Sequence, residues 1–194
     1  MFIFYLLIIL FSWPQNTDWK LEKDKNGIKV FTRKLDGYPI RQFSVETQVK
    51  AQIKDLDSLF RKIKNYPNWM ADIEKVDEIK QLDENTYQYY LILDSPFPSS
   101  NRDLMVEIKF LYPQKDILRL EIKDLKHLKA HQKGLVRIED LEGFWQFEIL
   151  DNDSLLIKNQ FISDPGGNIP SWITNQFLIQ NPFETTQSLI KQLE

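Results

Sequence analysis

Few residues in this sequence have the types and spacing that catalysis or metal binding requires. The chain has 194 residues and no cysteine, which excludes a thiol nucleophile, a disulfide framework and a Cys-ligated metal. Its two histidines, His127 and His131, would share one face if their segment were helical. The stretch from Lys126 to His131 is rich in lysine, however, and is more typical of a solvated hairpin loop. We therefore expect no metal and no other cofactor.

Two further groups have both a chemical and a structural interpretation. Gly166 and Gly167 precede an expected helix, whose N-terminal N–H groups could bind phosphate, but the pair also suits a simple break before a helix. Asp72, Asp77 and Glu78 could work as paired acids, although they are more typical of a solvated face. No H-E-x-x-H, G-x-S-x-G or glycine-rich phosphate motif occurs. We expect no catalytic residues.

Arg102 and Asp103 follow a loop rich in proline and serine, residues 94–101, and open a strand. Arg102 could meet a ligand head group at the mouth of a cavity. The two residues could instead form ion pairs with neighbouring charges and hold the loop, which is the interpretation that we favour. Trp145 and Trp172 also allow two roles, lining a cavity or filling a core, because an aromatic side chain buries about 150–250 Å² in either place.

Composition restricts the class of protein. Lys and Arg number 25 and Asp and Glu number 28, which gives a net charge of −3. Nucleic-acid-binding domains are usually basic or carry a basic stripe, so we expect no nucleic-acid partner. Apolar residues make up 42% and aromatic residues 13% of the chain, which is typical of a globular protein. The length fits one domain, and we expect a monomer.

The N-terminus differs from the rest of the chain. Residues 1–11 are uninterrupted apolar sequence, which as a helix would rise only about 16 Å, too little to cross a hydrocarbon core of about 30 Å. This length fits the hydrophobic region of a signal peptide, although a basic start and an A-x-A cleavage site are missing. We interpret 1–15 as a signal peptide (hydrophobic region 2–11) and 16–194 as one domain, exported to the periplasm or secreted. A membrane-surface anchor and a buried first element are the alternatives.

Most of the chain alternates apolar and polar residues with a period of two, the pattern of half-buried strands. Asn26 and Gly27 form a strong hairpin signal, and further turn signals occur at Gly37 and Pro39 and at 151–153. The expected strands are 28–33, 43–49, 76–81, 86–93, 104–110, 118–123, 145–149 and 155–163. Short strands separated by turns predict an antiparallel meander with one buried and one wet face.

Helical periodicity occurs in two places. The first begins at Asp55, which can cap a helix, and ends near Asn65. Its apolar face comprises Leu56, Leu59, Phe60 and Ile63. Tyr66 and Trp69 are expected to be exposed in the loop that follows. The second helix begins at Ile169 and Pro170, and Pro182 is expected to kink or split it.

These elements predict an α+β architecture. A curved antiparallel sheet must bury its apolar face, and the long C-terminal helix is the largest element available to cover it. A twisted sheet wrapped around one helix tends to leave an internal hydrophobic cavity between them.

The order of motifs resembles that of the START domain, the lipid-transfer domain related to the steroidogenic acute regulatory protein. The matching segments run from Trp19 to near the C-terminus: Trp19 with 26–33 (NGIKVFTR), 66–69 (YPNW), 100–103 (SNRD), 133–137 (KGLVR), 143–145 (GFW) and 164–172 (DPGGNIPSW) with Asn175. The resemblance implies a helix-grip fold that encloses one lipid, without catalytic residues or a metal. It also implies that the final helix and an adjacent loop form a lid.

One position departs from the family. Some sterol-binding members place an arginine inside the cavity, six residues after the arginine that matches Arg102, where this chain has Ile108. This face of the strand is expected to be wholly apolar, which weakens the transfer of sterol or phospholipid head-group specificity from the family to this chain. The candidate ligand-binding residues are Tyr89, Leu91, Leu104, Val106, Ile108, Phe110, Leu120, Trp145, Phe147, Trp172, Gln176, Phe177 and Ile179.

The sequence therefore predicts a protein that binds a lipid or small hydrophobic ligand. Transfer of this ligand, with transient membrane contact, is a further option. A cyclase- or aromatase-like enzyme on the same fold is one alternative. It would need an acid or base in a wet pocket, and only Tyr87, Tyr89 and Asn159 are polar candidates for the inward face. A protein-interaction module with a filled core is the other. A carrier should contain a cavity of several hundred Å³, whereas such a module should not.

Overall fold

The computed structural model describes residues 18–36, 38, 40–126, 130–151, 154–167, 169 and 171–194. The expected signal peptide, the turn residues Gly37 and Pro39, and His127 lie outside the described residues. Within the described chain, no helix is both long and apolar enough to cross a membrane.

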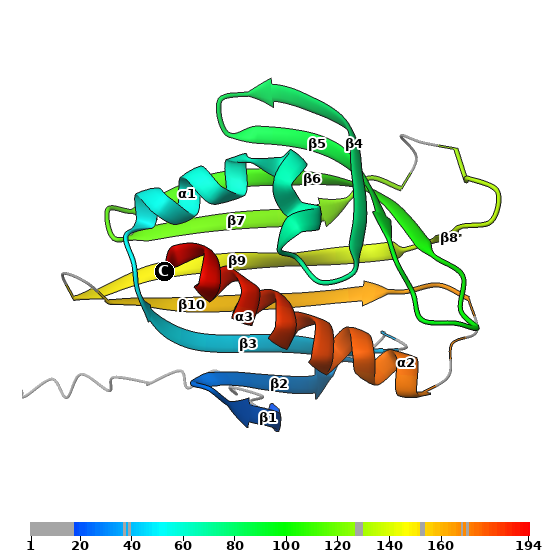
Figure 1. The fold of residues 1–194 in the computed structure, drawn as a ribbon, viewed down its shortest axis with the longest axis horizontal. Coiled ribbons are helices and arrows are strands. Elements are labelled where there is room, and N and C mark those ends of the chain that lie inside the picture. Colours follow the sequence, from blue (N-terminus) through cyan, green and yellow to red (C-terminus); the bar gives the residue numbers. More distant parts are fainter. Residues whose placement is uncertain are drawn as a thin grey trace, which may run out of the picture.

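One antiparallel sheet forms most of the molecule (Figure 1). The strands are β1 (Lys20–Lys25), β2 (Ile28–Lys34), β3 (Arg41–Lys50), β4 (Ile73–Asp83), β5 (Thr86–Leu93), β6 (Arg102–Gln114), β7 (Ile117–Asp124), β8 (Val136–Arg137), β9 (Glu139–Asp151) and β10 (Ser154–Asp164). Their order across the sheet is β1-β2-β3-β10-β9-β7-β6-β5-β4, and the short β8 pairs with β6 in parallel. The open sheet thus has β1 and β4 at its two edges.

Alternation along the strands selects the buried face, as the sequence predicts. On β6, Leu104, Val106 and Ile108 are buried, whereas Lys109 between the inward positions is exposed. Several strands extend beyond their predicted ends, among them β9, which begins at Glu139, and β4, in which most residues are exposed. A strand that is polar on both faces carries no apolar alternation, so the sequence gives no sign of its true length.

The first helical region corrects two predictions. Helix α1 (Ile53–Arg61) begins after Gln52, so Asp55 lies in its first turn rather than at its cap. There its negative carboxylate still interacts favourably with the positive N-terminal end of the helix dipole. Tyr66 and Trp69 are buried, not exposed, because the 3₁₀ helix η1 (Ile63–Asn68) folds back on α1. The Tyr66 hydroxyl donates a 2.6 Å hydrogen bond to the Phe60 carbonyl, and both aromatic rings meet Phe60 edge-on.

The C-terminal helix lies across one face of the sheet (Figure 1). It does not split at Pro182: it changes its helical type before that residue, and the backbone stays right-handed helical at Asn175 and Gln180. It consists of α2 (Ser171–Asn175), a π-helical segment η2 (Gln176–Gln180) and α3 (Asn181–Leu193). Pro182 falls in the first turn of α3, where a missing N–H is tolerated. On one side, Phe183 packs with Ile28, Val30 and Val45 of the sheet. The observed arrangement is the α+β helix-grip fold.

Candidate ligand-binding cavity

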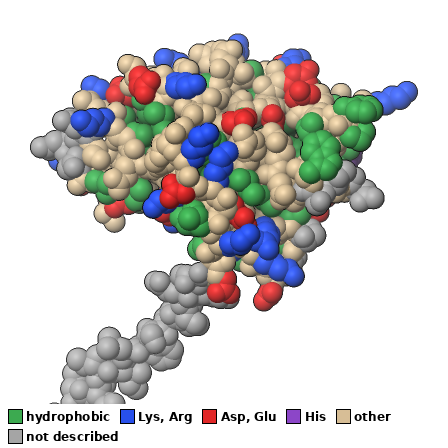
Figure 2. All heavy atoms as spheres, turned by 60° about the horizontal axis from the view of Figure 1, so that its bottom comes forward, with side chains coloured by type: hydrophobic (Ala, Val, Ile, Leu, Met, Phe, Trp, Pro, Cys, Tyr) green, Lys and Arg blue, Asp and Glu red, His purple; other side chains and the backbone are tan. Residues whose placement is uncertain are grey.

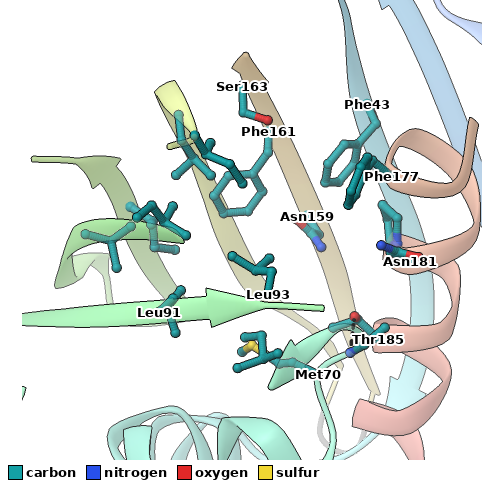
Figure 3. A pocket seen from close by; sticks show the side chains of 18 of the residues that line it. Phe43, Met70, Leu91, Leu93, Asn159, Phe161, Ser163, Phe177, Asn181 and Thr185 are labelled. Atoms are coloured by element: carbon teal, nitrogen blue, oxygen red, sulfur yellow. Dashed lines mark hydrogen bonds between the residues drawn. The ribbon is translucent and has the colours of Figure 1, made fainter. Parts of the chain in front are cut away.

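A cavity of about 230 Å³ lies between the sheet, the α1–η1 region and the C-terminal helix (Figure 3). Residues of the sheet, of the α1–η1 region and of the C-terminal helix form its walls. The described lining residues are Ile40, Phe43, Phe60, Tyr66, Met70, Ala71, Ile73, Tyr89, Leu91, Leu93, Leu104, Val106, Ile108, Ile122, Ile138, Leu141, Trp145, Asn159, Phe161, Ser163, Pro165, Thr174, Phe177, Leu178, Asn181, Pro182 and Thr185.

This lining has no formal charge. Among the described residues that line the cavity, none is Asp, Glu, Lys, Arg or His. The titratable side chains in it are Tyr66 and Tyr89, and burial raises the pKa of both phenols, so they stay neutral near pH 7. An ionised group placed inside would lose its hydration without gaining a counter-charge.

The cavity gathers about half of the ligand-binding residues that the sequence predicts. Those that line it are Tyr89, Leu91, Leu104, Val106, Ile108, Trp145 and Phe177. Three others, Phe110, Leu120 and Phe147, are buried in the main core but do not line the cavity. Phe147, for example, lies 5.4 Å from Phe60 between ring centroids.

The predicted helix face needs a correction. Trp172 is 51% exposed, and neither Gln176 nor Ile179 lines the cavity. Ile179 instead packs beside Phe183. The helix has one apolar side over the edge strands and another over the cavity, and the sequence pattern alone does not tell them apart. The cavity side carries Thr174, Phe177, Leu178, Asn181, Pro182 and Thr185.

Residues that the sequence does not single out as ligand-binding complete the wall. On β10, Asn159, Phe161 and Ser163 follow one another at a period of two and all reach the cavity. That alternation is a usable signal. Phe43 of β3 and Met70 after η1 also contribute, and Figure 3 shows these side chains surrounding the same space.

Gly143 of β9 makes room for one of these residues. It is the register partner of Phe161 on β10. A Cβ at position 143 would come within 2.3 Å of both the Phe161 ring and the Gln160 carbonyl oxygen. The ring thus covers the glycine, and on its other side it meets Phe43 at 6.0 Å between centroids.

Asp103 and Arg102 have the contacts of structural residues. Arg137 of β8 donates to both Asp103 oxygens, at 2.8 and 2.9 Å, and the Tyr90 hydroxyl donates to the same carboxylate at 2.7 Å. Burial alone would raise the pKa of Asp103, but these donors outweigh it and hold the pKa below its usual value. The ion pair ties β8 to β6.

Arg102 does not enter the cavity either. Its guanidinium donates to the Ser99 hydroxyl, to the Ser100 carbonyl at 2.6 Å and to the Pro165 carbonyl at 3.4 Å. It also lies 5.6 Å from the centre of the Phe177 ring. These contacts join the 94–101 loop to the segment that precedes α2.

Two hydrogen bonds, called the latch below, connect the loop after η1 to α3. The Ala71 N–H donates to Thr185 Oγ1 at 3.0 Å, and the Asn181 amide donates to the Asp72 carboxylate. Burial, together with the negative charges of Glu184 and Asp94, raises the pKa of Asp72 to about 6. Ala71, Asn181 and Thr185 all line the cavity, so the latch closes one of its sides.

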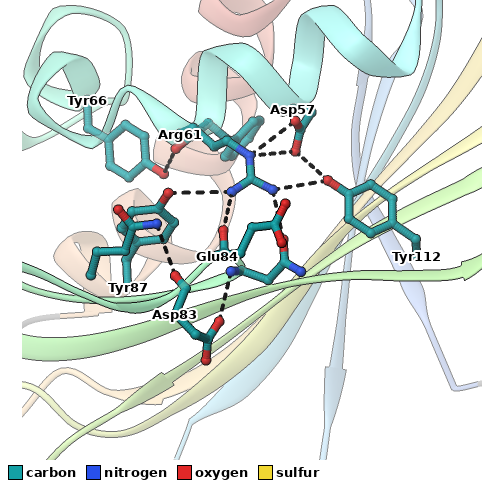
Figure 4. A network of polar contacts seen from close by, with 10 residues as sticks. Asp57, Arg61, Tyr66, Asp83, Glu84, Tyr87 and Tyr112 are labelled. Carbon is teal, nitrogen blue, oxygen red and sulfur yellow. Dashed lines mark hydrogen bonds and ion pairs between the residues drawn. The ribbon is translucent and has the colours of Figure 1, made fainter.

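A polar network fixes α1 on the sheet (Figure 4). Arg61 donates to Asp57 on its own helix, to the Glu84 carbonyl at 2.8 Å and to the hydroxyls of Tyr87 and Tyr112. It also donates to Asn85 Oδ1 at 3.0 Å. Because α1 carries Phe60, this network holds one wall of the cavity in place.

The expectation that His127 and His131 bind no metal stays a prediction, because His127 lies outside the described residues. His131 is exposed, and no group of three or more His, Asp or Glu residues suited to a metal ion occurs in the described part of the chain. Close packing requires a glycine at position 166, because a Cβ there would lie 2.6 Å from the Arg137 carbonyl oxygen. Its N–H is already bound to Asp164.

Comparison with known proteins identifies relatives of this fold. No family model matches the chain. An uncharacterized protein of Pseudomonas aeruginosa is 27% identical over 178 residues, which are 89% of this chain and 85% of that protein. The crystal structure of the STAR-related lipid transfer protein of Xanthomonas axonopodis is 31% identical with a TM-score of 0.81, covering 90% of this chain and 98% of that one.

More distant structures share the fold. Human StAR-related lipid transfer protein 5 has a TM-score of 0.80 at 16% identity, covering 93% of this chain and 88% of that one. The Zhui aromatase/cyclase of Streptomyces has a TM-score of 0.52 at 12% identity, covering 79% and 90%. The identity and coverage shared with the Xanthomonas protein decide the assignment: this chain belongs to the STAR-related lipid transfer, or START, family.

Proposed function

We propose that this protein binds an uncharged hydrophobic ligand in the cavity and carries it without catalysing a reaction. The observation that carries the proposal is the lining, which is almost wholly apolar and contains no charged residue among the described ones. Burial of apolar surface contributes about 25 cal/mol per Å², so a ligand of several hundred Å² binds here with few polar contacts.

The size of the cavity narrows the class of ligand. A volume of about 230 Å³ lies just below the range of about 300–1,000 Å³ that is usual for drug-sized ligands. A single acyl or prenyl chain suits this space better than a sterol or a two-chain lipid. A larger ligand requires the C-terminal helix to move outward, which means that the latch opens.

Membership of the START family supports carriage, because the Xanthomonas relative is named as a lipid transfer protein. Transfer requires the protein to meet a membrane. Two exposed aromatic residues suit that contact: Phe97, which is 92% exposed in the 94–101 loop, and Trp172 at the start of the C-terminal helix. On the face of the molecule that Figure 2 shows, positive and negative side chains are interspersed, and they form no continuous basic stripe.

The two alternatives have less support. A cyclase needs an acid or base beside its substrate, whereas the described lining offers Tyr66 and Tyr89 as its titratable groups, both with a raised pKa. Likeness to the Streptomyces enzyme at 12% identity concerns the fold alone. A filled-core interaction module is disfavoured by the cavity itself.

Native mass spectrometry of the purified protein, followed by solvent extraction, tests the proposal. We expect a stoichiometric adduct whose extracted mass identifies a neutral lipid. Val106→Phe, which fills the cavity from β6, should remove the adduct, whereas Lys109→Phe on the outer face of the same strand should keep it. A bare protein that takes up no fatty alcohol, fatty acid, sterol or phospholipid would contradict the proposal.

Export is a second part of the proposal, and it rests on the apolar segment 2–11. We propose that residues 1–15 direct the chain out of the cytoplasm and are then removed. Cell fractionation with intact-mass measurement tests this. A mature protein that begins near residue 16 outside the cytoplasm is expected, and a full-length chain in the membrane fraction would favour the anchor instead.

A further inference from the structure

We infer that Asn159 is the polar anchor of the cavity: its amide hydrogen-bonds the uncharged polar group of the bound ligand, a hydroxyl or amide, and so selects such ligands over ionised and purely apolar ones. This inference rests on the proposed function and adds a ligand class to it.

The position of Asn159 in the sheet is the first argument. Register places it in a row of inward side chains that crosses the sheet, between Trp145 of β9 and Val45 of β3. The row continues to Leu120 on one side and to Val30 on the other. These four neighbours are apolar, so a polar residue stands where the fold would accept a hydrophobic one; the row reaches a lysine, Lys23, only at the edge strand β1.

The amide of Asn159 is buried without a hydrogen-bond partner among the described residues. Asn159 is only 4% exposed and lines the cavity, and its Oδ1 has no hydrogen-bond partner. Its Nδ2 likewise has none among the described residues. A buried amide that stays unpaired costs free energy, which a leucine in its place would not. Figure 3 shows the side chain projecting from β10 toward the space that the labelled residues enclose.

Three of the other polar groups in the wall are already engaged. Asn181 and Thr185 form the latch, and the Tyr66 hydroxyl is bound to the Phe60 carbonyl. The other buried polar atoms that lack a partner in the described chain do not face the cavity; they belong to Ser44, Trp69, Ser95 and Asp124. Asn159 Oδ1 is therefore the one buried polar atom without a partner in the described chain that lies in the cavity wall.

The chemistry of an amide defines the ligand group. One end donates and the other accepts, which matches a hydroxyl or another amide. A carboxylate or phosphate could use only the donor end and would bring a charge into a wall without cations. An alkane would leave the amide unpaired, as it is now.

Isothermal titration calorimetry at pH 8 with four ligands of one chain length, decane, decanol, decanamide and decanoate, tests the inference. The variants are Asn159→Leu and, as a matched control, Gln160→Leu, whose side chain lies on the outer face of the same strand. We expect the wild-type protein to bind decanol and decanamide more tightly than decanoate. We expect its preference for decanol over decane to fall about tenfold in Asn159→Leu and to persist in Gln160→Leu.

The possible failures are distinguishable. If the wild type and Asn159→Leu prefer decanol over decane by the same factor, Asn159 is not the polar anchor. That result is expected when a bound water already satisfies the amide, and it leaves the proposed function standing. Tightest binding of decanoate also overturns it. Binding of none of the four overturns both proposals. If Asn159→Leu does not fold, the four affinities of the wild type test the inference. Weaker binding of decanol than of decane would overturn it, because the ligand hydroxyl would then be buried without a partner.

Discussion

The ring of Phe161 on β10 lies over Gly143 on β9 and fills the space that a side chain at position 143 would occupy. The glycine is thus part of the cavity wall, although it contributes no side chain. Phe161 reaches the cavity because its cross-strand neighbour has no Cβ.

Gly143→Ala should therefore disturb the cavity as well as the sheet. We expect a loss of about 1–3 kcal/mol in the free energy of unfolding, typical of overpacking, because the new methyl group meets both the Phe161 ring and the Gln160 carbonyl oxygen. Urea denaturation measures this. The double variant with Phe161→Ala, which removes the ring and its Cγ, should recover part of the loss. An undiminished loss in the double variant would show that the contact with the Gln160 carbonyl, not the ring, causes it.

Asp103→Ala should be the more damaging change. It leaves the Arg137 guanidinium buried without its carboxylate, for which a loss of about 3–5 kcal/mol is expected. Tyr90→Phe is the control, because it removes one hydrogen bond to Asp103 and keeps the ion pair, at a cost of about 1 kcal/mol. Chemical denaturation of both variants checks the order, and equal losses would contradict a dominant ion pair.

The dependence of stability on pH should reveal Asp72. Its pKa is raised to about 6 in the folded protein, so the folded state binds this proton more tightly than the unfolded state does. The contribution of Asp72 to stability is therefore fully present below about pH 4 and is lost as the pH rises to about 6.

Asp72→Asn removes that titration and suits the positive φ of 59° at this position, because asparagine tolerates the left-handed region. Melting temperatures between pH 4 and pH 7 test the prediction. The variant should gain on the wild type as the pH rises from 4 to 6 and show a constant difference above that. A difference that does not change with pH would contradict the raised pKa.

Opening of the latch should control ligand exchange. Thr185→Val keeps the shape of the side chain but removes the acceptor for the Ala71 N–H. We expect ligand to dissociate several-fold faster, because one of the two latch bonds is gone. Stopped-flow release of a fluorescent fatty alcohol measures the rate, and Thr186→Val, whose hydroxyl bonds within α3, is the control. Unchanged release from the Thr185 variant would show that the exit lies elsewhere.

Membrane contact should depend on the two exposed aromatic residues near the start of the C-terminal helix. Phe97→Ser and Trp172→Ser should each weaken sedimentation with phosphatidylcholine vesicles several-fold and leave stability unchanged. Leu150→Ser is a suitable control, because the end of β9 that carries Leu150 lies at the opposite end of the molecule from α2 (Figure 1). Equal loss in all three variants would argue against a defined contact surface.

Strand periodicity allowed the sheet to be predicted well. The alternation from Leu104 to Phe110 corresponds to an observed strand, and the family motifs agree with the fold. At Pro182 the helix continues from a π-helical segment instead of splitting. Tyr66 and Trp69 were misassigned because a tight turn after a helix carries no apolar period. Their burial depends on contacts with Phe60 that only the folded chain shows.

The cavity was harder to predict than the sheet. An inward side chain can line a space or fill a core, and alternation is the same for both: Ile108 lines the cavity, whereas Phe110, two residues later, does not. The helix posed a similar difficulty, since Ile179 and Leu178 are both apolar neighbours on different sides of it. Which one faces the cavity depends on the angle at which the helix crosses the sheet.

The open sheet ends at β1 and β4, and both edges discourage pairing with another chain. Lysine and acidic residues occupy most of β1, and β4 is interrupted by register shifts and by a positive φ at Glu78. Charges and bulges at an edge make a new strand unfavourable to add. A protein that hides its apolar face around a cavity must resist aggregation while that cavity opens, and these two edges supply the resistance.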